Sequence, residues 1–122
     1  MNHTVLIVDD DFDLRETLRD VLQDEGYAVA TAEDGLAALA YLEKNSAPCM
    51  ILLDWMMPRC NGAEFRERQC QVPAFAAIPV VLLTADARHD EKVAATGAQH
   101  YLAKPVTRAT LCSVVRSICP VP

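Results

Sequence analysis

Val5-Leu6-Ile7-Val8-Asp9-Asp10-Asp11 joins an apolar run directly to three carboxylates. The run is too short for a helix, is rich in β-branched residues and does not alternate, which is typical of a strand covered on both faces. Such strands indicate a parallel sheet, whose ligand sites lie outside the carboxyl ends of the strands. Three further apolar runs lead to reactive side chains in the same way: Met50 to Leu53 before Asp54, Val80 to Leu83 before Thr84, and Tyr101-Leu102 before Lys104-Pro105.

Helical patterns separate these runs. Leu14, Leu18, Val21 and Leu22 recur at helical spacing and Gly26 follows them, which predicts a helix over 12–25. The other predicted strands cover 27–31, 49–53, 80–83 and 100–102, and the other helices cover 34–45, 63–70, 88–96 and 111–118, with a loop over 71–78. Five alternations of strand and helix predict a doubly wound α/β fold, flavodoxin-like (βα)5, with a five-stranded parallel sheet in the order 2-1-3-4-5.

The length of 122 residues fits one domain, which we expect to span 1–122. A formal charge of −6 argues against a general affinity for nucleic acid, so we expect no direct nucleic acid binding. No apolar run approaches the roughly 18 residues of a membrane span, and no basic segment precedes the first run. We therefore expect a cytoplasmic protein with no membrane partner.

The five cysteines form an odd set without C-x-x-C spacing, and no histidine stands at ligand spacing. Neither a zinc site nor a complete disulfide framework is indicated. Because free cysteine behaves as a small buried hydrophobe, we expect reduced thiols, with Cys49 and Cys112 in or near the core.

Asp9, Asp10 and Asp54 are expected to meet at the carboxyl edge of the sheet. Two carboxylates at ~4 Å repel by about 1 kcal/mol in water and by more when desolvated, so a cation is needed between them. Mg²⁺ prefers such hard oxygen ligands. Asp11 and Asp13 have a simpler interpretation, since they stand where they can cap the first helix and complement its dipole.

Asp54 directly follows a buried strand, where rigid backbone would hold its carboxylate as a nucleophile. A phosphoryl group formed there could contact the Lys104 ammonium and the Thr84 hydroxyl, although Lys104 could instead be a plain ion-pair partner and Thr84 a strand-end cap. The peptide bond before Pro105 could be cis, an isomer that the sequence leaves open. Tyr101 is either a core aromatic, which composition favours, or a reporter of the site.

Four motifs in order resemble the receiver domain of two-component response regulators. They are V-D-D-D-x-D-L-R at 8–15, L-L-D-W-M-M-P at 52–58 followed by Gly62, L-L-T-A at 82–85 and Y-L-A-K-P at 101–105. Each motif alone is weak, but all four in order and at appropriate separations make a specific signal, and the resemblance extends over essentially the whole chain. The resemblance implies a signalling domain rather than a classical enzyme, and one that accepts phosphate from a sensor histidine kinase or a histidine phosphotransfer protein.

The resemblance also implies a role for each site residue. Asp54 would be the phosphoacceptor. Asp10 and Asp54 would bind Mg²⁺ together with the Met56 backbone carbonyl, and Asp9 would help through water. Thr84 and Tyr101 would form the switch pair, and Lys104, with a cis bond to Pro105, would contact the phosphate. An output domain or a second copy would use the face formed by the fourth helix, the fifth strand and the fifth helix.

Some positions depart from the family pattern. The stretch from Thr84 to Lys104 is shorter than the family usually shows around the fourth helix, so the shape of that output face is open. Met56 and Asp86 stand two positions beyond the phosphoacceptor and Thr84. In such domains these positions tune the loss of phosphate, and we expect Asp86 to act through its charge.

Three alternatives compete with a phosphoacceptor. A phosphatase of the haloacid dehalogenase type needs a second aspartate two residues after the first, where Met56 stands. A dinucleotide-binding domain needs G-x-G-x-x-G after the first strand, and that motif is missing from the sequence. A receiver-like binding module that works without phosphorylation stays open as the alternative.

Overall fold

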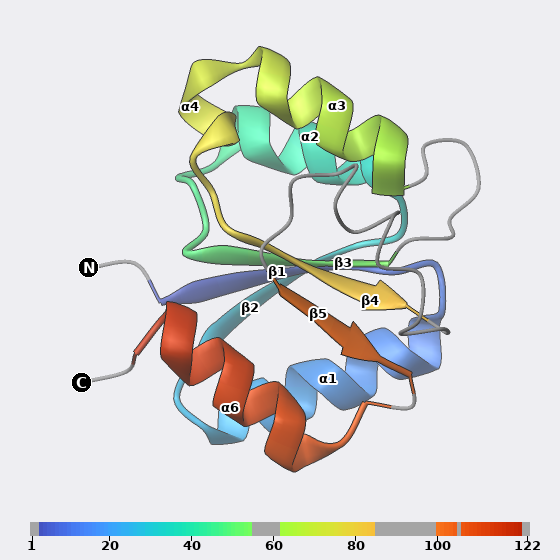
Figure 1. Cartoon of the computed structure of the whole chain (residues 1–122), viewed down its shortest axis with the longest axis vertical. Helices are drawn as coiled ribbons and strands as arrows, with labels where there is room; N and C mark the ends of the chain where they lie inside the picture. The colour runs from blue at the N-terminus through green and yellow to red at the C-terminus, as the bar shows by residue number, and fades with distance from the viewer. Residues whose placement is uncertain (1–2, 55–61, 85–99, 105, 121–122) are drawn as a thin grey trace.

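A computed structural model describes residues 3–54, 62–84, 100–104 and 106–120. Its parallel sheet has the order β2-β1-β3-β4-β5, as predicted. Helices α2, α3 and α4 cover one face, and α1 and α6 cover the other (Figure 1). The elements are β1 Thr4–Val8, α1 Phe12–Asp24, β2 Ala28–Ala32, α2 Gly35–Lys44, β3 Met50–Asp54, α3 Gly62–Gln71, α4 Pro73–Ala76, β4 Val80–Thr84, β5 His100–Ala103 and α6 Arg108–Ile118.

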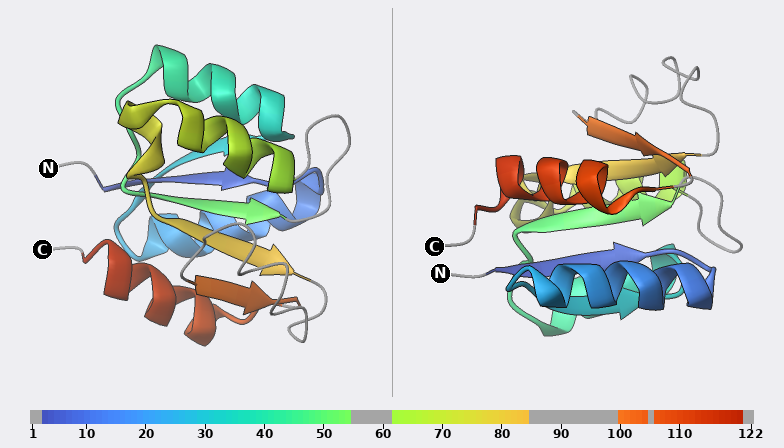
Figure 2. Two further views of the ribbon diagram at one scale, coloured as in Figure 1. Left: turned by 45° about the horizontal axis from the view of Figure 1, so that its top comes forward. Right: turned by 90° about the horizontal axis from the view of Figure 1, so that it is seen from below.

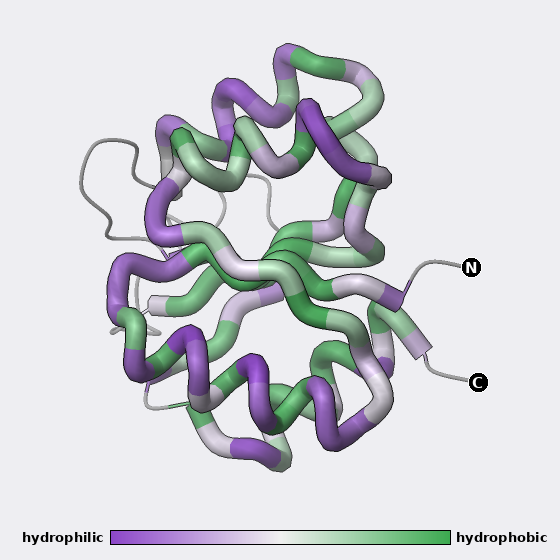
Figure 3. The backbone as a smooth tube through the Cα atoms, turned by 180° about the vertical axis from the view of Figure 1, so that it is seen from behind, coloured by the Kyte–Doolittle hydropathy of each residue, from purple (hydrophilic) through white to green (hydrophobic). Residues whose placement is uncertain are grey.

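The central strands are buried on both faces, which explains their unbroken apolar runs. In β1, Val5 and Ile7 pack into the core beneath α1 and α6, while Leu6 and Val8 pack into the core beneath α2 and α3. Figure 3 shows the strands as a hydrophobic centre, with hydrophilic segments along the helices outside it. Alternate side chains of one strand therefore serve two separate cores.

The helix termini follow the sequence signals. Asp11 caps α1 by accepting a hydrogen bond from the Leu14 backbone N–H at 3.2 Å. Asp34 caps α2 by accepting one from the Ala37 N–H at 2.8 Å. Gly26, just beyond α1, has a φ of 98°, a left-handed conformation that glycine adopts without steric cost.

The predicted loop over 71–78 contains a short helix, α4, so that prediction is wrong in part. Pro73 stands in the first helical position, where its fixed φ suits a helix and its missing N–H costs nothing. The fully buried Gln69 amide donates hydrogen bonds to the carbonyls of Phe75 at 2.7 Å and Ile78 at 3.2 Å, and so holds this turn against α3. The predicted helix over 88–96 lies outside the described residues.

The prediction of five reduced thiols is wrong for Cys49 and Cys119, which form a disulfide. Cys49 immediately precedes β3 and Cys119 follows α6, whose last turn lies at the end of the sheet where β3 begins (Figure 2). Sequence spacing could not show this proximity, because 70 positions separate the two residues. Among the described cysteines Cys70 and Cys112 are free, and Cys112 is buried as expected.

Within the described ranges, the longest and most apolar helices still fall short of what crossing a membrane requires.

Candidate functional site

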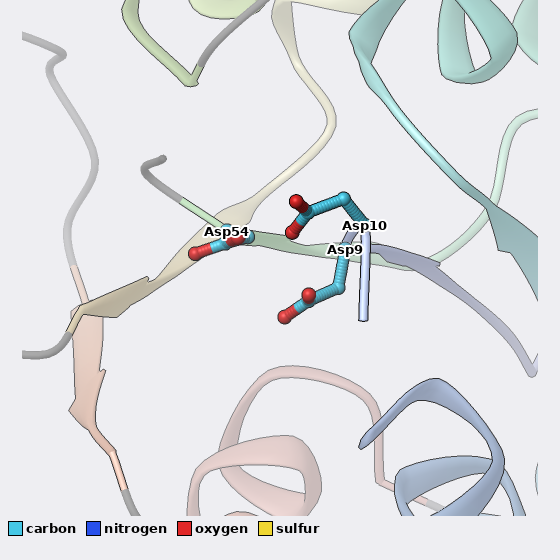
Figure 4. A group of neighbouring side chains, drawn as sticks. All are labelled: Asp9, Asp10 and Asp54. Atoms are coloured by element: carbon cyan, nitrogen blue, oxygen red, sulfur yellow. The ribbon is translucent and has the colours of Figure 1, made fainter. Parts of the chain in front are cut away.

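Strand pairing brings the three predicted metal-binding carboxylates together. Asp9 follows β1, Asp54 ends β3, and the pairing of Val8 with Leu53 makes the two aspartates neighbours across the strands. Asp9, Asp10 and Asp54 can each offer an oxygen within 4.8 Å of the others, and Figure 4 shows the carboxylates gathered beside the ends of these strands. The backbone thus holds like charges close together.

Asp9 is the most enclosed of the three, with no exposed surface. Its Oδ1 accepts a hydrogen bond from the Asp11 backbone N–H at 2.9 Å, whereas its buried Oδ2 has no hydrogen bond. The Lys104 Nζ lies 3.3 Å from that Oδ2 and supplies an ion pair instead. A buried carboxylate oxygen with so little polar contact is a place where a cation is favourable.

Lys104 bridges two strands electrostatically, with its Nζ 3.2 Å from Asp54 Oδ1 as well as near Asp9. Its backbone N–H donates to the Thr84 carbonyl at 2.7 Å, which fixes the chain beyond β5 against the end of β4. Burial alone would lower the pKa of Lys104, but the negative charges of Asp54 and Asp9 and the hydrogen bond to Asp54 outweigh burial and raise it. Lys104 is therefore an ammonium at neutral pH.

The residues fit a small divalent cation. Three carboxylates face one ammonium, so the cluster keeps an excess of negative charge. Asp10 is exposed while Asp9 and Asp54 are buried, so the cluster opens to solvent on the side of Asp10. Hard oxygen ligands with one open side match the preference of Mg²⁺ for a few carboxylates and retained waters.

Thr84 ends β4 and is half-buried, next to the backbone of Lys104. Tyr101, in the edge strand β5, is 41% exposed, so the interpretation of Tyr101 as a core aromatic is wrong. Leu102, its neighbour, takes the buried position on β5, and alternation along the strand sends Tyr101 to the opposite face.

Three residues with predicted roles, Met56, Asp86 and Pro105, lie outside the described residues.

One residue that sequence reasoning did not single out also contacts the site. Arg15 Nη1 donates a hydrogen bond to the Asp9 carbonyl at 2.6 Å, and its guanidinium lies over the Phe12 ring at 5.6 Å. The sequence could have indicated this contact, because Arg15 stands one helical turn after the capping residue Asp11 and so lies close to the acidic segment 9–11.

Comparisons with known proteins agree on one family. The model of the response regulator receiver domain matches residues 5–116. The phosphate regulon transcriptional regulatory protein PhoB of Pseudomonas aeruginosa is 33% identical over 94% of this chain, and the chain spans about half (51%) of that protein. The chemotaxis protein CheY4 of Vibrio cholerae superposes with a TM-score of 0.88 at 32% identity, over 97% of this chain and 99% of CheY4.

A third protein shares the fold at lower identity. The receiver domain of the sensor histidine kinase PA1611 from Pseudomonas aeruginosa, solved with magnesium in its active site cleft, has a TM-score of 0.88 at 24% identity, over 99% of this chain and all of that one. At that identity the likeness concerns the fold alone. The family model, which matches nearly all of the sequence, and the shared architecture carry the assignment: this chain belongs to the response regulator receiver domain family.

Proposed function

We propose that the chain is a phosphoacceptor switch in which Asp54 receives a phosphoryl group from a phosphohistidine. Membership of the receiver family supports a signalling role. The observation that carries the proposal is the contact of Lys104 Nζ with both Asp54 and Asp9 beside Asp10, which combines a nucleophile with positive charge and cation ligands at one sheet edge.

The transfer is a substitution at phosphorus. An Asp54 oxygen forms the new P–O bond as the P–N bond to the donor histidine breaks, and the electron pair and a proton remain with the imidazole. The transferred group carries negative charge that the Lys104 ammonium offsets, so Lys104 exchanges its carboxylate partner for phosphoryl oxygens. Catalysis is then mainly positioning and charge neutralisation.

Magnesium completes the proposed chemistry by neutralising charge on the phosphoryl oxygens when it is bound. Asp10 and Asp54 would hold it, with Asp9 acting through water and the Met56 carbonyl as a further ligand by family resemblance. The carboxylates of this chain themselves favour a cation, since the buried Asp9 Oδ2 has no hydrogen bond and an ion pair only with Lys104.

We propose that phosphorylation causes a conformational change that is transmitted from Thr84 to Tyr101. Thr84 adjoins Lys104 at the end of β4, and Tyr101 lies exposed on β5, the neighbouring strand. Attraction of the Thr84 hydroxyl to the phosphoryl group would favour an inward Tyr101, and phosphorylation shifts the population only as far as its contacts differ between the two states. Loss of Tyr101 exposure on adding beryllofluoride, followed by tyrosine fluorescence quenching, tests this step.

Met56 and Asp86 are proposed to set the lifetime of the phosphorylated state. A negative charge at Asp86 would repel the phosphoryl group or orient a water near it. An Asp86→Ala variant should therefore change the rate of phosphate loss, followed by intact mass after the donor is removed. A decay rate equal to that of the wild type would remove Asp86 from this role.

The phosphate donor and the cellular location are also part of the proposal. The phosphate donor would be a sensor histidine kinase or a histidine phosphotransfer protein in the cytoplasm. PhoB is a transcriptional regulator, CheY4 a chemotaxis protein and PA1611 a sensor kinase, so the family alone leaves the output open. We propose that output, whether a linked domain or a second copy, uses the face containing β5 and α6, without direct nucleic acid or membrane binding.

Acetyl phosphate with Mg²⁺, followed by intact mass measurement, tests the central proposal. We expect one phosphoryl adduct in the wild type, none in Asp54→Asn, and a much slower gain in Asp10→Asn. Asp20→Asn is the matched control, because Asp20 is exposed on α1 away from the cluster, and it should behave as wild type. An undiminished adduct in Asp54→Asn would contradict Asp54 as the acceptor, and a wild-type reaction unaffected by chelating Mg²⁺ would contradict the role of the metal. No adduct in the wild type would favour a binding module that works without phosphate.

A further inference from the structure

We propose that Cys49 and Cys119 form a reversible redox site that fastens the last turn of α6 to the start of β3. Their Cα atoms are 6.1 Å apart, within the roughly 4.4–6.8 Å that disulfides span. The bond closes a loop across 70 positions of sequence. Nothing in the phosphoacceptor role calls for this link, so it is a second chemical site in the domain.

The C-terminal turn of α6 is anchored at this same point. Cys119 is 4% exposed and belongs to the core formed by α1, α6 and one face of the sheet. Its carbonyl accepts a hydrogen bond from the buried Tyr27 hydroxyl at 2.5 Å, and its N–H donates to the Val115 carbonyl at 2.7 Å. Because helix ends fray, a covalent bond at Cys119 decides whether the turn can leave these contacts.

The two sulfurs differ in access. Cys49 is partly exposed whereas Cys119 is buried, so we take Cys49 Sγ as the sulfur that an external thiol attacks. In reduction, a glutathione thiolate attacks Cys49 Sγ to form a mixed disulfide, and Cys119 Sγ leaves with the electron pair and takes up a proton. A second glutathione then releases the Cys49 thiol, so that two glutathiones supply two electrons and become glutathione disulfide. Oxidation by glutathione disulfide is the reverse.

The other described cysteines are poor competitors for this exchange. Cys70 is exposed, but it lies on α3, on the opposite face of the sheet from α6. Cys112 lies on α6 but is buried, and burial together with the nearby Glu25 charge raises the pKa of its thiol. A thiol kept protonated is a weak nucleophile. Among the cysteines that the structure describes, the geometry therefore favours the Cys49–Cys119 pair.

Oxidation should stabilise the domain strongly because the closed loop is long. In the chain-entropy model such a bond raises the melting temperature of a domain this size by on the order of 10 °C. In a compartment that keeps thiols reduced, disulfides are usually transient and redox-sensing, so the bond would report an oxidising change. The site lies at the amino end of β3 and Asp54 at its carboxyl end, so the two chemistries can be tested apart.

The test equilibrates the purified chain in mixtures of reduced and oxidised glutathione, quenches with acid, alkylates free thiols and maps the peptides by mass. We expect a linked Cys49–Cys119 peptide that disappears as reduced glutathione increases, with a fall in melting temperature on the order of 10 °C. Cys49→Ser and Cys119→Ser should lack both the linked peptide and the shift. Cys70→Ser is the matched control and should keep both.

Hydrogen exchange adds a local measurement that does not depend on a variant that folds poorly. Reduction of the wild type should speed exchange of the amides in the last turn of α6. A linked peptide that never forms would overturn the proposed site, and one that no glutathione ratio removes would overturn its reversibility. Equal melting temperatures and equal amide exchange in the reduced and oxidised proteins would contradict the proposal that the disulfide holds the last turn of α6 to the start of β3. Each result is independent of whether Asp54 accepts phosphate.

Discussion

The positive charge of Lys104 offsets the repulsion between the carboxylates of the acidic cluster. It is 28% exposed and lies within 3.3 Å of carboxylates from two different strands. We expect Lys104→Met to lower the free energy of unfolding by ~1–3 kcal/mol without Mg²⁺, because it leaves the buried Asp9 charge uncompensated. Urea unfolding measures the loss, and Lys44→Met, at an exposed position on α2, should change it little.

Lys104 and Asp54 should be energetically coupled, because the ammonium of Lys104 offsets the charge of Asp54. Asp54→Asn removes one of the repelling charges, so Lys104→Met should cost less in that background than in the wild type. Mg²⁺ should also restore part of the unfolding free energy that Lys104→Met loses, since the bound cation replaces the missing ammonium. Equal costs in both backgrounds would mean that Lys104 stabilises the fold through packing of its stem instead.

At the scale of single elements, the two capped helices differ in how deeply their caps are buried. Asp34 is 1% exposed and accepts from the Ala37 N–H at 2.8 Å, whereas Asp11 is exposed and its bond to Leu14 measures 3.2 Å. We expect Asp34→Ala to cost ~1–2 kcal/mol of unfolding free energy and Asp11→Ala about 0.5. Urea unfolding of both variants, in parallel with the wild type, checks the order, and a larger loss in Asp11→Ala would contradict it.

For the whole molecule, the sheet was predictable chiefly because β1, β3 and β4 are short, unbroken apolar runs. The runs ending at Val8 and Leu53 are buried on both faces of the sheet. The apolar stripe of α1, which begins at Leu14, covers one of these two faces. The helix at Pro73–Ala76 was missed because a single turn leaves no periodicity, and only Pro73 marks its start.

The site was predictable to the extent that strand ends determine it. Asp9, Asp54 and Lys104 each end or follow a strand, so the parallel sheet alone brings them together. The disulfide and the exposure of Tyr101 depend on tertiary placement, which local pattern does not carry. Cys49 and Cys119 have no motif between them, and Tyr101 looks like a core residue until β5 is known to be the edge strand.

One charged cluster joins parts of the chain that no local pattern connects. Glu25, just beyond α1, accepts a hydrogen bond from Arg108 at 3.0 Å and another from Arg116, both on α6. Hydrogen bonds from Arg108 and then Arg116 lower the pKa of Glu25 below its usual 4.5. The pair α1 and α6 forms one layer of the molecule, so this link bears on how that layer responds to acid (Figure 1).

The sign of the response follows from the direction of the shift. A carboxyl group whose pKa is lower in the folded state stabilises the fold above its unfolded value, and this contribution is lost as pH falls through the folded pKa. We therefore expect Glu25→Gln to be less stable than the wild type at pH 7, and we expect the difference to shrink as pH falls past 4.5 and to vanish only below the lowered pKa of the folded state. Urea unfolding across this range measures it, with Glu16→Gln, from an exposed pair with Arg19, as the control that changes little at any pH. A difference that persists undiminished in acid would show that Glu25 holds α1 to α6 through packing and not through its charge.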